Sequence, residues 1–142
     1  MGDLALVAYD GSPLAQRALE YALRKFPDDD LLVFYVVDPV YAVYEAEFGG
    51  PAQAKRWPDD VADVSTRLLE EAKSTAADHA GDVTTASATG KPERKILEAV
   101  DEYDADAVVM GSHGRTGVSR LVMGSTAEAV MRHSPVPVTV VR

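Results

Sequence analysis

The sequence predicts an α/β fold in which a mostly parallel sheet is covered by helices on both faces. Short β-branched runs alternate along the chain with segments of helical periodicity, which is typical of successive βαβ units. The runs at residues 4–9 and 31–37 are almost entirely apolar, as strands buried on both faces should be. With 142 residues and 46% hydrophobic content, residues 1–142 are expected to form one domain.

The first strand, residues 4–9, belongs in the centre of the sheet because it has almost no polar face. Ser12 then offers an N-cap and Pro13 a first helical residue for a helix that ends near Lys25. The apolar side chains of this helix recur at helical spacing and predict one buried face: Leu14, Ala15, Ala18, Leu19, Ala22 and Leu23.

After the second strand, residues 31–37, the segment 38–58 has no clean period and exceeds the ~12–15 residues usual for a structureless loop. Either its aromatic side chains pack on the domain as a side flap, or the segment covers a ligand as a lid. A second helix follows from Asp59 to about Ala80, where Gly81 ends it.

The second half of the chain adds three strands and two helices. A Thr-rich strand at residues 83–89 is expected near a sheet edge, and the helix opened by Pro92 is expected to turn Tyr103 inward. The remaining elements are a strand at residues 105–110, a fourth helix from Ser125 to about His133, and a last strand at residues 136–141.

The composition excludes several function classes. Fourteen Lys and Arg against 23 Asp and Glu give a formal net charge of -9, which repels nucleic acid and anionic lipid. The chain has no cysteine, so thiol chemistry and disulfides are excluded. No uncharged apolar run approaches the ~18 residues of a membrane span, and the N-terminus lacks a signal-peptide pattern. We therefore expect a cytoplasmic protein that binds neither nucleic acid nor membrane.

The connection between the fourth strand and the fourth helix is the most informative segment. Gly111, Gly114 and Gly124 are separated by two and nine residues, and the hydroxyl residues Ser125 and Thr126 follow. Glycine permits positive φ and lets a ligand touch the main chain, while the first N–H groups of a helix lack internal partners. Together these features predict an anion-binding turn.

Neighbouring side chains fit the same interpretation. Arg115 and Arg120 would supply local positive charge for a polyphosphate, and Met110 is interpreted as core or pocket wall rather than a metal ligand. No lysine follows Lys95, which excludes a P-loop, and the first βα turn at residues 9–13 has one glycine, which disfavours NAD binding.

Four segments resemble the nucleotide-binding branch of the universal stress protein family, and together they span the chain. These segments are Ala8–Ser12, Val36–Asp38, the Gly111, Gly114, Gly124, Ser125, Thr126 spacing, and Ser134–Val138. The resemblance implies an open parallel five-stranded sheet of order 3-2-1-4-5, of the adenine nucleotide alpha hydrolase-like kind. It also implies that ATP, with ADP or AMP as alternatives, binds with Mg²⁺ in the crevice where the strand order reverses.

By position, the resemblance also implies a role for each site residue. Asp10 would accept a hydrogen bond from the ribose, Gly111 would approach it, and the main chain of Val36 would meet the adenine edge. Ala8 and Tyr9 would line the wall. The residues implied to hold the phosphates are Gly114, Gly124, Ser125 and Thr126.

Some of these residues also admit a purely structural interpretation. Asp10 alone would be explained by the turn that its side chain holds with Gly11. Ser125 and Glu128 match a capping box, in which Ser125 satisfies its own helix. His113 is interpreted as a solvated loop histidine rather than a general base, and His133 as a complement to a helix C-terminus.

The last strand, residues 136–141, would lie at a sheet edge in this strand order. An apolar edge only partly blunted by Pro137 invites pairing, and the resemblance implies a homodimer through Val136–Val141. The alternative is a monomer whose edge is covered by its own loop.

Three functions remain open at this point. The first is a nucleotide-dependent stress-response regulator or scaffold that binds ATP and is not a dedicated enzyme, although slow hydrolysis is compatible with it. The second is a weak ATPase or a nucleotidyl or phosphoryl transferase, which the lack of a lysine in the glycine-bearing connection disfavours. The third is a nucleotide-independent, chaperone-like dimer, which would leave the glycine spacing without a purpose.

Overall fold

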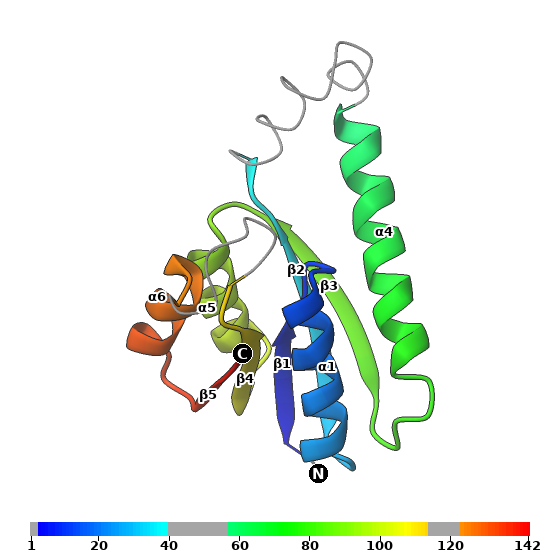
Figure 1. Ribbon diagram of the computed structural model, residues 1–142, viewed down its shortest axis with the longest axis vertical. Coiled ribbons are helices and arrows are strands. Elements are labelled where there is room, and N and C mark those ends of the chain that lie inside the picture. The colour runs from blue at the N-terminus through cyan, green and yellow to red at the C-terminus, as the bar shows by residue number, and fades with distance from the viewer. Residues whose placement is uncertain (1–2, 40–56, 114–122) are drawn as a thin grey trace.

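A computed structural model describes residues 3–39, 57–113 and 123–142. Five strands form a parallel sheet in the order β3-β2-β1-β4-β5 (Figure 1), which confirms the predicted fold class and strand order. In chain order the elements are β1 (Leu4–Ala8), α1 (Pro13–Lys25), β2 (Asp30–Val37), α4 (Trp57–Thr75), β3 (Val83–Thr89), α5 (Pro92–Glu102), β4 (Ala107–Gly111), α6 (Ser125–His133) and β5 (Val138–Val141).

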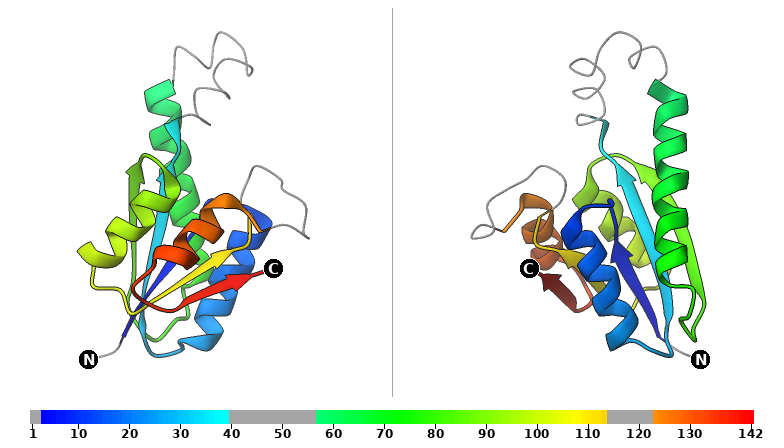
Figure 2. Two further views of the ribbon diagram at one scale, coloured as in Figure 1. Left: turned by 90° about the vertical axis from the view of Figure 1, so that its left-hand side faces the viewer. Right: turned by 45° about the vertical axis from the view of Figure 1, so that its right-hand side comes forward.

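Helices cover both faces of the sheet (Figure 2). Each face has its own layer of buried side chains. On one face, α1 and α4 pack over a cluster that includes Val7 and Val33. On the other, α5 and α6 pack over a cluster that includes Leu6 and Leu32. Because side chains alternate along a strand, consecutive residues enter opposite layers, which explains why β1 and β2 are apolar almost without interruption.

The central strand β1 ends before its neighbour β2. The pairing of β1 with β2 runs from Leu4↔Asp30 to Ala8↔Phe34, whereas the pairing of β2 with β3 continues to Val37↔Thr89. On its other side β1 pairs with β4. The strand order therefore reverses at β1, and the projecting end of β2 forms one wall of a crevice there.

Some predicted boundaries are wrong in detail. β4 begins at Ala107, because Asp104 adopts a φ of 52° and turns the chain before the strand. β5 begins at Val138, because the Ser134 hydroxyl bonds both the N–H and the carbonyl of Val136 and holds a turn. Tyr103 does not face inward: it is the C-cap of α5 and is 40% exposed.

The second predicted helix is shifted along the chain, since α4 begins at Trp57 and ends at Thr75. The alternatives of a flap or a lid concern residues 40–56, which lie outside the described residues. β3 and β5 are the two edge strands and β1 is central, as predicted. Within the described ranges, no helix combines the length and the apolar character needed to cross a bilayer.

Substitution of Leu6 tests whether β1 lies at the centre of the sheet. We expect Leu6→Ala to lower the free energy of unfolding by about 2–5 kcal/mol, because the fully buried side chain would leave a cavity. Leu97→Ala, at a partly buried position on α5 in the same layer, should cost less. Urea unfolding followed by circular dichroism measures both losses, and equal losses would contradict the placement of Leu6 at the centre.

Candidate functional site

A cavity of about 280 Å³ lies at the carboxyl ends of β1, β2 and β4, where the strand order reverses. Every predicted site residue in the described ranges lines it: Ala8, Tyr9, Asp10, Val36, Met110, Gly111, Gly124, Ser125 and Thr126. Gly114, Arg115 and Arg120 lie outside the described residues. Sequence positions more than a hundred residues apart thus meet around one space.

Several other residues line the cavity although they were not predicted as site residues: Ser12, Ala15, Phe34, Tyr35, Asp38, Pro92, Ile96, His113 and Ala127. Phe34 and Asp38 could have been predicted as lining residues, because residues two positions from Val36 along a strand face the same side of the sheet. Nothing in the local sequence marks Pro92 and Ile96 as site residues, because the position of α5 at the cavity depends on its packing against α6, β2 and β3.

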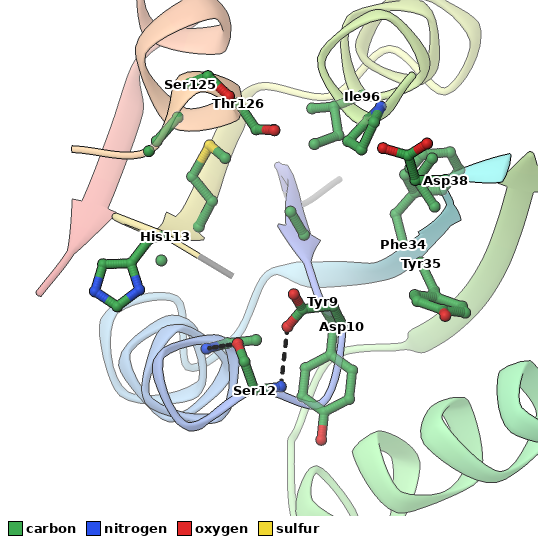
Figure 3. Close-up of a pocket in the computed structure, with 18 residues that line it drawn as sticks. Tyr9, Asp10, Ser12, Phe34, Tyr35, Asp38, Ile96, His113, Ser125 and Thr126 are labelled. Atoms are coloured by element: carbon green, nitrogen blue, oxygen red, sulfur yellow. Dashed lines mark hydrogen bonds between the residues drawn. The ribbon is translucent and has the colours of Figure 1, made fainter. Parts of the chain in front are cut away.

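The turn after β1 is held by its own side chains. Asp10 Oδ1 accepts a hydrogen bond from the Ser12 N–H at 2.9 Å, and Ser12 Oγ accepts one from the Ala15 N–H at 3.2 Å. Gly11 adopts a φ of 79°, a conformation that favours glycine. The turn-forming role considered for Asp10 is thus confirmed, and Figure 3 shows its other carboxylate oxygen directed toward the cavity.

Tyr9 belongs to the cavity and to the core at once. Its main chain follows β1 and donates to the Phe34 carbonyl at 2.9 Å, while its ring points away from the cavity toward α4 (Figure 3). Burial raises the pKa of the Tyr9 phenol above its ordinary value of 10.0, and the charges of Glu71 and Asp10 add to this. The phenol is therefore most stable in its neutral form.

The start of α6 differs from the capping box that the sequence suggests. Gly124 is the N-cap and the helix has no side-chain capping hydrogen bond, so Ser125 is already inside the first turn. Glu128 instead pairs with Arg132 at 2.8 Å. The Ser125 and Thr126 hydroxyls are thus not used for capping, and both residues line the cavity beside the first N–H groups of α6.

Two of the glycines are required by close packing. Gly124 has a φ of -64°, so positive φ does not explain it. A Cβ there would lie 2.9 Å from the Ser112 carbonyl oxygen, and the Gly124 N–H donates to that oxygen at 2.6 Å. At Gly111 a Cβ would lie 2.9 Å from the Leu14 Cβ. Glycine lets the end of β4 approach both α1 and the start of α6.

The main chain of Val36 faces the cavity. The Phe34 carbonyl accepts from Tyr9 on the β1 side, and the Val37 carbonyl accepts from Gly90 on the β3 side. Because main-chain groups alternate in direction along a strand, the N–H and C=O of Val36 turn toward β1. Since β1 has already ended at Ala8, they turn into the crevice.

His113 is not the solvated loop histidine that we expected. Both of its ring nitrogens are buried and have no hydrogen-bond partner in the part of the chain that the structure describes. A buried polar group without a partner costs roughly 1–3 kcal/mol. His113 lies at the rim of the cavity, between the end of β4 and the start of α1 (Figure 3).

The electrostatics of the described lining are acidic. Asp10 and Asp38 are the carboxylates, and the described lining residues include no lysine or arginine. Positive potential comes from the helix N-termini at Ser12 and Gly124, both of which line the cavity. Among the described residues, no group of three or more histidine or acidic side chains is placed to hold a metal ion.

Comparisons with known proteins point in one direction. A model of the universal stress protein family matches residues 3–142. The chain is 36% identical over 146 residues to a putative universal stress protein of Staphylococcus saprophyticus, over 96% of this chain and 81% of that protein. It is 29% identical over 143 residues to the universal stress protein YxiE of Bacillus subtilis, over 96% of this chain and 97% of that protein.

Solved structures share the fold. The hypothetical protein MJ0577 superimposes with a TM-score of 0.82 at 24% identity, over 99% of this chain and 96% of that one. A universal stress protein family member from Arabidopsis thaliana with AMP bound gives 0.70 at 19% identity, over 97% and 90% of the two chains. A universal stress protein in complex with cAMP gives 0.66 at 22% identity, over 99% and 97%.

The Tyr9 phenol predicts a specific response to alkaline pH. Because its pKa is raised in the folded state, its stabilising contribution is complete below pH 10.0 and is lost as the pH rises through the folded pKa. We expect Tyr9→Phe to reduce the fall in unfolding free energy above pH 10.0, as measured by urea unfolding across that range. Tyr103→Phe removes an exposed phenol and is the control, and equal alkaline slopes for the two variants would contradict the assignment.

Proposed function

The chain belongs to the universal stress protein family, and from this premise we propose that it binds an adenine nucleotide in the cavity at the carboxyl end of its sheet. The observation that carries the proposal is the meeting of Asp10, Val36, Gly111 and the Gly124–Thr126 turn around that one cavity. AMP and cAMP in two structures of the same fold support this ligand class. The volume of about 280 Å³ is close to the lower limit of about 300 Å³ typical of ligand pockets.

The start of α6 is suited to phosphate. Its first N–H groups lack partners within the helix, and the Ser125 and Thr126 hydroxyls lie beside them. Gly124 has no side chain to keep a ligand from this main chain. The ring N–H of His113 could also donate to a phosphate at the same rim, since neither ring nitrogen has a partner among the described residues.

The opposite half of the cavity is suited to a nucleoside. Phe34, Pro92 and Ile96 offer apolar surface to a base, and the main-chain N–H and C=O of Val36 turn toward the same space. Asp10 directs a carboxylate oxygen into the cavity and could accept a hydrogen bond from a ribose hydroxyl (Figure 3). These contacts would orient the nucleotide with its phosphates toward α6.

ATP with Mg²⁺ is the ligand form that we propose. The described lining carries the carboxylates of Asp10 and Asp38 and no cationic side chain, so the peptide dipoles of the helix N-termini are the positive groups that it offers to a polyphosphate. Mg²⁺ would supply positive charge held by the phosphates and water, with no need for a cage of protein ligands. We propose that nucleotide occupancy alters the shape or the partner choice of a stress-response regulator.

Calorimetric titration with ATP and Mg²⁺ tests the proposal, and ADP release is followed in parallel. ATP binding with negligible ADP formation supports a regulator, and rapid ADP formation supports an enzyme. Titrations that show no heat of binding would rule out nucleotide binding. We expect Thr126→Val to weaken ATP binding about tenfold, because a hydrogen bond to a charged phosphate is lost. Thr84→Val makes the same change on the exposed edge of β3 and should leave the affinity unchanged.

We also propose that the chain forms a homodimer through β5. Among the described strands β5 pairs with β4 alone: the Pro137 and Val141 carbonyls accept from the N–H groups of Val108 in β4 and of Ser112 directly after it. By alternation, the N–H groups of Val138 and Val140 turn outward from the sheet. A second β5 related by a two-fold axis would satisfy both.

Substitution of Val140 distinguishes pairing between two copies of β5 from the pairing of β5 with β4. Val140→Pro removes an outward N–H group while the bonds to β4 remain, so we expect it to shift the chain from dimer to monomer in sedimentation velocity experiments. Val140→Ala truncates the side chain but keeps the N–H group, and it should remain a dimer. A dimer of unchanged stability in Val140→Pro, or a monomeric unsubstituted chain, would rule out pairing through this edge.

A further inference from the structure

Asp38 occupies a distinctive place in the cavity. It follows β2 directly and shares the strand parity of Phe34 and Val36, so the three residues line the same wall. Figure 3 shows its carboxylate beside Ile96, on the side of the cavity opposite Ser125 and Thr126. Among the described residues of this apolar half, Asp38 contributes the only charged side chain.

This arrangement gives the cavity an electrical polarity. The start of α6 carries the positive end of a helix dipole, and Asp38 carries a full negative charge on the opposite wall. An anionic ligand lowers its energy by placing its phosphates at α6 and its least anionic end at Asp38. In a nucleotide that end is the base, so the base is the part that Asp38 meets.

An ionised carboxylate accepts hydrogen bonds and donates none. It therefore favours a base that presents an amino group and disfavours one that presents a carbonyl oxygen at the same position. Its two oxygens offer about four lone-pair sites, so Asp38 can accept from a base in addition to contacts within the protein. The Val36 carbonyl on the same wall also accepts hydrogen bonds, but it carries only a partial charge, so the Asp38 carboxylate distinguishes an amino group from a carbonyl oxygen more strongly.

We propose that Asp38 is a specificity-determining residue that selects a 6-amino purine over a 6-oxo purine. The inference rests on the proposed function, because it assumes that a purine nucleotide occupies the cavity. It adds a side-chain criterion for the base: the exocyclic amino group of adenine donates to the Asp38 carboxylate, while the carbonyl oxygen of hypoxanthine is repelled by it.

Calorimetric titration with AMP, IMP and purine riboside monophosphate tests this selection. In the unsubstituted chain we expect AMP to bind most tightly and IMP more weakly than purine riboside monophosphate, which carries neither group. In Asp38→Asn, whose amide can donate to a carbonyl, we expect the ratio of AMP to IMP affinity to fall about tenfold. Asp63→Asn removes the same charge at an exposed position on α4 and should leave the ratio unchanged.

The outcomes separate the two proposals. If AMP binds but the ratio is unchanged in Asp38→Asn, or IMP binds as well as purine riboside monophosphate, base selection by Asp38 is wrong and nucleotide binding stands. If none of the three ligands binds the unsubstituted chain, both proposals fail. Comparison of the three ligands in the unsubstituted chain needs no variant, so IMP binding as tightly as purine riboside monophosphate would overturn base selection by Asp38 even if Asp38→Asn folds poorly.

Discussion

The hydrogen bonding of β1 to a parallel neighbour on each side is the constraint on which the rest of the molecule depends. It places β1 at the centre of the sheet, buried on both faces, and the helices that follow β1 and β4 lie on opposite faces. The connections that leave the carboxyl ends of β1 and β4 go to opposite faces, so a crevice forms between them. Asp10, Val36 and Gly111 meet there because each belongs to the end of a strand.

Main-chain contacts, more than charged side chains, shape the described part of this crevice. Gly111 and Gly124 bring β4, α1 and α6 to distances that a side chain would prevent. The exposed peptide groups at the start of α6 then provide positive potential in a chain whose net charge is -9. An acidic protein can attract an anion in this way because partial charges at contact distance outweigh a screened distant field.

The resemblance to the universal stress protein family implied the strand order, and that order placed the residues next to the ends of the first and fourth strands at one crevice. Prediction from the sequence failed where a side chain responds to three-dimensional packing. Tyr103 is the C-cap of α5 and does not face inward, Ser125 lies inside α6 rather than at its N-cap, and the ring nitrogens of His113 are buried. Pro92 and Ile96 were missed because no local pattern records which helix packs over the end of β2.

The alternation of β2 has a consequence for how such a protein can diversify. Phe34, Val36 and Asp38 face the crevice, while the side chains of Tyr35 and Val37 belong to the layer under α1 and α4. Phe34 is also a buried member of the layer under α5 and α6, whereas Val36 and Asp38 are only partly buried, so substitutions at positions 36 and 38 can change recognition with less effect on packing. Along the end of β2, recognition and packing thus depend on different residues. Mutation can alter the ligand that is recognised while the buried residues keep the chain folded.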